Sequence, residues 1–143
     1  MSLAASLRRF KADRVQALPA RIVRETVEEF GERLVTDWTP LGNPELWKSP
    51  PPAEYRPGNL RSSWFFGVGS PSTERTERTD GRQINGLGAL ADVKAGDAVY
   101  LANSADHAGS IEAGHSSQAP TGIMVNAMEF EGIAYAVARR IAR

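Results

Sequence analysis

The residues that could carry out acid–base or metal chemistry gather between positions 104 and 115. The chain has two histidines, His107 and His115, with Asp106 and Glu112 close by in sequence. Such a set could supply metal ligands or a general acid and base. Ser104, Asp106 and His107 also provide the residue types of a nucleophilic triad, although adjacency in sequence is not the spatial arrangement that a triad requires.

All of these residues lie in a run of small residues and glycines, whereas catalytic and ligand sets normally sit on rigid elements. We therefore expect polar surface or interface residues here, with no metal, no cofactor and no catalytic residue. A small hydrolase that uses His107 or His115 together with Glu112 is the enzymatic alternative.

Residues 86–91, GLGALA, superficially fit the glycine fingerprint of dinucleotide-binding folds. That fingerprint requires a buried strand directly before it and a βαβ unit around it. A polar loop precedes the segment in this chain, so we reject a nucleotide site. The sequence contains no cysteine, which excludes a disulfide, a thiolate zinc site and a cysteine nucleophile.

The basic residues are mostly arginines. Lys+Arg and Asp+Glu number 17 each, so the formal net charge is zero and does not itself favour nucleic acid or membrane. Arginine suits both carboxylates across interfaces and phosphates. A cluster near the N-terminus could face DNA, and a second cluster at the C-terminus is explained by the dipole of a closing helix. The possible DNA-facing residues are Arg8, Arg9, Lys11 and Arg14.

The length of 143 residues predicts one domain, 1–143. The longest apolar runs are far shorter than the roughly 20 residues that cross a bilayer, so we expect no membrane association. The arginines of the N-terminus follow its short apolar patch instead of preceding it, and we therefore do not expect a secretory signal.

Residues 3–38 show the periodicity of one long amphipathic helix. Pro19 interrupts the pattern and is expected to kink or split this helix near residue 18. So long a helix is marginal in isolation and needs a sheet or a neighbouring copy to pack on. Its apolar stripe consists of Leu3, Leu7, Phe10, Val15, Leu18, Ile22, Thr26, Phe30 and Leu34.

The rest of the chain alternates extended segments with short elements. Residues 39–57 form a Pro-rich connector, which Trp47 and Tyr55 are expected to fasten, and residues 70–86 form a polar loop that is solvent-exposed or disordered. A turn that leads into a short helical turn is expected at 56–62, and a short helix at 87–94. The expected strands are 64–69, 98–103 and 123–127, and a closing helix spans 128–141.

These elements predict an α+β fold. A long N-terminal helix and a C-terminal helix pack on a small, mainly antiparallel sheet, and long loops connect them.

The segment from residue 100 to residue 125 carries the first part of a family resemblance. A strand ends at Asn103, small residues including Ala108 follow, and EAG at 112–114 and SSQAPTGIMV at 116–125 complete the pattern. Upstream, residues 57–64 read PGNLRSSW and look like a Thr-Gly-x-Leu-Arg-x-Ser element, with Pro57 in the place of the threonine. The motif and turn residues of the two elements are Gly58, Leu60, Arg61 and Asn103.

These two ordered elements, between a long first helix and a short last one, resemble the neck and tail-completion proteins of long-tailed phages, a group related to the lambda-type minor tail protein Z. Residues 39–56 and 70–86 have no counterpart in the pattern. An aromatic side chain is common in the family where His107 and Ala113 stand, so packing there is expected to differ.

The resemblance implies a structural protein of the virion and no enzyme. Copies would form a ring at the head–tail junction around the DNA channel, six-fold or alternatively twelve-fold, and would contact other neck, connector and tail-tube proteins. Assembly would take place in the host cytoplasm. An Arg-rich DNA-binding accessory protein is the alternative. The suspected subunit-interface residues are Glu112, Gly114, Ser116, Gln118, Pro120 and Gly122.

Overall fold

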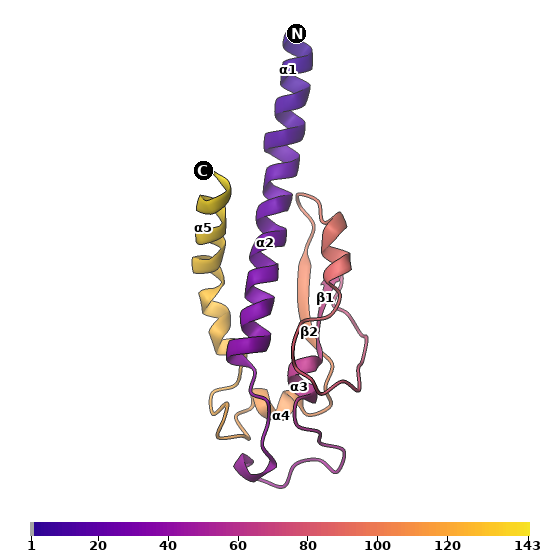
Figure 1. Ribbon diagram of the computed structural model, residues 1–143, viewed down its shortest axis with the longest axis vertical. Helices are drawn as coiled ribbons and strands as arrows, with labels where there is room; N and C mark the ends of the chain where they lie inside the picture. The colour runs from indigo at the N-terminus through magenta and orange to yellow at the C-terminus, as the bar shows by residue number, and fades with distance from the viewer. Residues whose placement is uncertain (1) are drawn as a thin grey trace.

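A computed structural model describes residues 2–143, and one long helical rod dominates its shape (Figure 1). The rod comprises α1 (Leu3–Phe10), the π-helical η1 (Lys11–Ala17), α2 (Leu18–Arg33) and the π-helical η2 (Leu34–Trp38). The predicted helix over 3–38 is therefore confirmed.

Pro19 does not separate the rod into two helices. The winding changes before it, because η1 is π-helical and the N–H of Leu18 donates to the carbonyl of Asp13, five residues back. A proline lacks an N–H and its ring collides with the carbonyl four residues earlier in α-helical geometry. The wider π turn relieves that collision, so the predicted interruption takes the form of a change in winding and not of a break.

The sheet consists of two antiparallel strands, β1 (Trp64–Val68) and β2 (Val99–Asn103), paired from Trp64 opposite Asn103 to Val68 opposite Val99. The other edge of β1 receives a single parallel bridge from Asn85, whose N–H donates to the Trp64 carbonyl at 2.9 Å. With the helices, this hairpin makes the α+β fold that the sequence predicts.

The prediction of a strand at 123–127 is wrong. The segment forms a 3₁₀ helix, η5 (Met124–Glu129), which leads into α5 (Phe130–Ile141). Within this segment only Ile123 is buried. A strand with one face on the core would bury every second residue, and that pattern is missing. The closing helix is confirmed.

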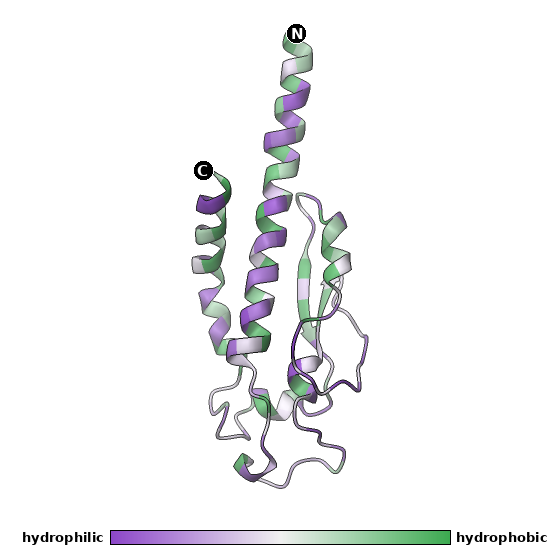
Figure 2. Ribbon diagram, in the orientation of Figure 1, coloured by the Kyte–Doolittle hydropathy of each residue, from purple (hydrophilic) through white to green (hydrophobic). Residues whose placement is uncertain are grey.

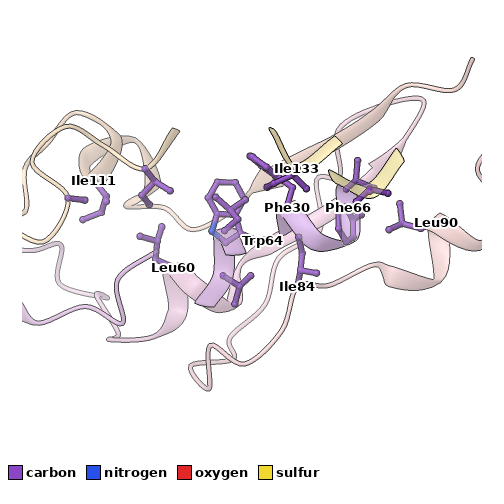
Figure 3. Close-up of a cluster of buried hydrophobic side chains, with 14 of the residues drawn as sticks. Phe30, Leu60, Trp64, Phe66, Ile84, Leu90, Ile111 and Ile133 are labelled. Atoms are coloured by element: carbon purple, nitrogen blue, oxygen red, sulfur yellow. The ribbon is translucent and has the colours of Figure 1, made fainter. Parts of the chain in front are cut away.

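The core lies where α2 meets α5 on one side and the hairpin on the other (Figures 1 and 3). Phe30 of α2 contacts the ring of Phe130 edge-on, at 5.5 Å between centroids. Phe66 of β1 approaches the same helix at Gly31, where an added Cβ would lie 2.8 Å from its ring. A glycine at this point of the helix therefore lets the strand pack closely against it.

The loops are fastened to this core. The connector carries a 3₁₀ turn, η3 (Pro44–Leu46), and leads to α3 (Asn59–Ser62). The loop at 70–86 is mostly exposed, but Ile84 is only 5% exposed and belongs to the core. The prediction of a solvent-exposed loop is therefore wrong at its C-terminal end. A single apolar residue in a polar run gives no periodic signal.

Two further short helices complete the chain, η4 (Leu87–Asp92) and α4 (Ala108–Glu112). The first was predicted and the second was not. Between residues 2 and 143, none of the helices combines the length and apolar character that crossing a membrane requires.

Candidate functional site

The segment from Asn103 to Val125 is folded against the Pro-rich connector. Ser116 forms an antiparallel bridge with Trp47. The N–H of Lys48 donates to the His115 carbonyl at 2.9 Å, and the N–H of Ser117 donates to the Leu46 carbonyl at 3.0 Å. Two segments that are about seventy residues apart in sequence thus lie side by side through main-chain hydrogen bonds.

Gln118 adds a side-chain bond to this junction. Its Oε1 accepts the N–H of Asn43 at 3.0 Å, close to the N-cap of η3. The ammonium group of Lys48 donates to the carbonyl of Gly114 at 2.7 Å. Ser116 is almost fully buried, whereas Pro120 is exposed.

Two glycines of the segment occupy positions that exclude a side chain. Gly114 has φ +78° and an added Cβ would lie 2.4 Å from the Pro120 carbonyl oxygen. Gly122 has φ +79° and its Cβ would lie 2.6 Å from the Glu112 carbonyl oxygen. Both are left-handed turns where the chain touches itself.

Glu112 connects the two halves of the segment. Its carboxylate accepts the N–H of Ile123 at 2.8 Å and the N–H of Met124 at 3.1 Å. These donors begin η5, so the carboxylate satisfies main-chain groups that a helix start leaves without partners. Main-chain donors therefore engage the carboxylate, and within residues 2–143 neither histidine donates a hydrogen bond to it.

His107 lies beneath the connector in a cluster of rings. Its ring centroid is 5.0 Å from that of Tyr55 in an edge-on arrangement and 6.1 Å from that of Trp47. The side chain is 5% exposed, and its Nε2 has no hydrogen-bond partner among the described residues. Burial lowers the pKa of His107, and the nearby Asp106 opposes this shift.

We expect the stability of the protein to fall with acidification because of His107. The unfolded chain protonates this histidine below pH about 6.5, whereas the buried ring resists the charge, so stability is fully present above that pH and is lost below it. His107→Phe should reduce the loss of urea midpoint between about pH 8 and about pH 5.5.

His115→Phe is the matched control for this effect, because His115 is exposed. It should leave the pH dependence of the wild-type protein unchanged. An identical pH profile for His107→Phe and the wild-type protein would contradict the assignment.

The second resemblance element, at residues 57–64, connects the end of the long helix with the end of β2. Gly58 (φ +87°) is buried and precedes α3, and Leu60 is 5% exposed. Arg61 donates from Nε to the Thr39 carbonyl at 2.7 Å. Asn103 donates from Nδ2 to the Leu60 carbonyl at 2.8 Å, which ties the end of β2 to α3.

The chemistry-bearing side chains do not converge. Asp106 pairs with Arg75, the buried hydroxyl of Ser104 has no hydrogen-bond partner among residues 2–143, and His115 is exposed. Within the described range 2–143, no three residues among His, Cys, Asp and Glu are placed to hold a metal ion. The GLGALA segment forms η4 after Gly86 and follows a loop, and the sheet beside it is an antiparallel hairpin, so a dinucleotide-binding unit is not formed.

A second distinctive feature is the projecting half of the rod, residues 3–17, which we call the arm. It extends beyond the rest of the molecule (Figure 1), and no residue of α1 or η1 is buried. Its apolar and polar residues alternate along the ribbon (Figure 2). Leu3, Leu7, Phe10 and Val15 are 77%, 58%, 60% and 53% exposed.

The arm also carries the suspected DNA-facing cations Arg8, Arg9, Lys11 and Arg14. In the part of the chain that the structure describes, only Arg9 among them has an ion-pair partner, Asp13 at 3.5 Å. Because both groups are well exposed, this pair contributes little stability.

The sequence predicted that the long helix needs a sheet or a neighbouring copy to pack on, but it did not show that residues 3–17 are the uncovered part, and it missed the exposed outer surface of α5. Met128 and Tyr135 are 85% and 67% exposed. Periodicity identifies an apolar stripe but does not tell where the covering elements end. The first helix is much longer than the closing helix, and this difference in length was the signal that part of the first helix would stay uncovered.

No family model, curated protein or solved structure matches the chain.

Proposed function

We propose that this protein is a structural component of the neck of a long-tailed phage, where copies form a ring that joins the head connector to the tail around the DNA. The observation that carries the proposal is the arm. A helical segment with no buried residue and an apolar stripe more than half exposed has the character of a surface that another subunit covers.

Elementary energetics supports a role in assembly. An isolated helix of this length is marginal in water, and each of its large apolar side chains would gain roughly 1.5–3 kcal/mol on full burial. A neighbouring subunit supplies that burial, and the binding then adds to the stability of the folded chain. The order of the elements, from long helix to hairpin to closing helix, agrees with the resemblance.

The suspected interface residues divide into two groups. Gly114, Ser116 and Gly122 are buried and shape the segment from within. Glu112, Gln118 and Pro120 are exposed. Glu112 and Gln118 already bind main-chain groups of their own chain, so we place any intersubunit contact of this segment at Pro120.

Deleting the gene from its phage should produce filled heads and complete tails that do not join, which electron microscopy would detect directly. Joined, infectious particles in the absence of the protein would refute the neck role. Pro120→Arg should give the same defect in weaker form, while Pro52→Arg, at an exposed proline of the connector, should leave plaque yield normal.

One observation favours a second function. Arg8, Lys11 and Arg14 lie on the arm without ion-pair partners in the described chain, so phosphates could bind them. As a DNA-binding accessory protein, the isolated chain would shift duplex DNA in a gel with an affinity that falls steeply with salt. Replacing the three cations by glutamine would remove the shift. A shift that is absent at low salt and high protein concentration rules this function out.

A further inference from the structure

The outer surface of η5 and α5 forms a second exposed apolar patch, separate from the arm. Met128 is 85% exposed, and Ala136 is exposed on the same side of the helix. Between them, an added Cβ on Gly132 would meet no atom within 4 Å. Together with Glu29 and Arg33 of α2, these residues line an open groove of about 450 Å³.

The groove and the arm carry opposite net charge, because Glu29 and Glu129 outnumber Arg33 along the groove. The arm holds four cations and one carboxylate, a net charge of +3. The groove is flanked at its start by Glu129 and Glu131, both exposed. Among residues 2–143, Glu131 has no ion-pair partner and Glu129 has only Arg33, at 3.9 Å. Carboxylates with so little internal pairing are available to cations of another molecule.

The protein also contains a precedent for the packing. Within one chain, α5 covers the buried face of α2 (Figure 1), with Ile133 and Val137 almost fully buried. The arm continues that same helix, and its stripe of Leu3, Leu7 and Phe10 continues the stripe of Leu18 and Phe30. A second α5 laid along the arm would continue this helix-on-helix packing, but through its outer face, because its own α2 already covers Ile133 and Val137.

We infer that the arm of one copy packs, antiparallel, into the α5 groove of a second copy of this chain. Leu7 and Phe10 lie over Ala136 and Gly132, and Lys11 and Arg14 face Glu129 and Glu131. The inference rests on the proposed ring and names the contact between its neighbouring subunits. The two surfaces differ, so the contact is heterologous and can propagate from copy to copy until a ring closes.

Pairing of two arms is the main competing arrangement. It would bring two segments of net charge +3 together. Like charges across an interface oppose association, whereas the α5 groove offers both an apolar floor and carboxylates. The arrangement with α5 therefore explains the cations of the arm as well as its apolar residues.

The absence of cysteine from the chain permits a direct test with the full-length protein. Leu7→Cys combined with Ala136→Cys, treated with a short bismaleimide, should give a ladder of multimers on a denaturing gel. Ala12→Cys combined with Ala136→Cys is the matched control, because Ala12 lies on the opposite face of the arm, and it should remain monomeric.

Three results would overturn the inference. They are a protein that stays monomeric at every concentration, a ladder of equal strength from the Ala12 control, and a strong dimer from Leu7→Cys alone, which would indicate arm–arm pairing. As an independent measurement, Phe10→Glu should weaken self-association by about tenfold or more in sedimentation, whereas Ala12→Glu should change it little.

The outcome is separable from the neck role. If gene deletion leaves heads and tails unjoined but the cysteine pairs give no ladder, the neck role stands and the contact is elsewhere. If the ladder forms but deletion particles join normally, the contact stands and the neck role fails.

Discussion

Gly58→Ala is expected to lower the free energy of unfolding by roughly 3 kcal/mol or more. The glycine has φ +87°, and an added Cβ would lie 2.0 Å from the carbonyl oxygen of Thr79. Its N–H also donates to the carbonyl of Leu41, so this one residue holds the connector and the polar loop together. Neither backbone partner can withdraw without loss of these contacts.

Gly69→Ala separates the two causes of this effect. Gly69 has a similar φ, +79°, but no atom lies within 4 Å of an added Cβ. Only the left-handed backbone then opposes alanine, which costs about 1–2 kcal/mol. Urea unfolding of both variants gives the comparison. Equal losses would show that the contact with Thr79 contributes nothing.

Trp64→Ala is expected to cost about 3–5 kcal/mol, the range for removing a large buried aromatic side chain. The side chain is 5% exposed. Its indole N–H donates to the Thr39 hydroxyl at 2.9 Å, and that hydroxyl donates to the Leu34 carbonyl at 2.6 Å. The tryptophan thereby fastens β1 to the last turn of the long helix, as well as filling the core.

Two milder variants divide the effect between packing and hydrogen bonding. Thr39→Val leaves the buried indole N–H without a partner and should cost about 1–3 kcal/mol. In the double variant with Trp64→Phe, the loss should be less than the sum of the single losses, because both remove the same bond. Strict additivity in urea unfolding would contradict the proposed hydrogen bond.

Much of the fold follows from local pattern. The stripe from Leu3 to Leu34 predicts the long helix, because a period near 3.6 residues is a property of neighbouring residues alone. The aromatic run at 64–68 and the apolar segment before Asn103 likewise predict the two strands. Trp47 and Tyr55 were expected to fasten the connector, and both pack against His107.

The errors arise where distant residues decide the conformation. Residues 123–127 have strand-like composition, but the carboxylate of Glu112 binds the main-chain groups that begin η5, and a 3₁₀ helix results. Ile84 lies in a polar run and gives no pattern, yet it enters the core beside Gly31. Tertiary contacts override local propensity in both cases.

The candidate site divides in the same way. The sequence singled out Gly58 as a motif residue and Gly114 and Gly122 as suspected interface residues, and all three have positive φ. It also indicated Glu112, Ser116 and Gln118 as suspected subunit-interface residues, but it did not predict that each of them contacts its own chain. Their place at a subunit contact stays a prediction, since one chain cannot display its partner.

The sequence by itself determined the class of elements, their order and the absence of cysteine chemistry, since periodicity, turn residues and composition act over a few neighbouring positions. Only the tertiary structure decided that the arm has no cover and that the segment from Asn103 to Val125 lies against the connector. Both depend on where the other elements end in space, which is set by packing between residues far apart in the chain.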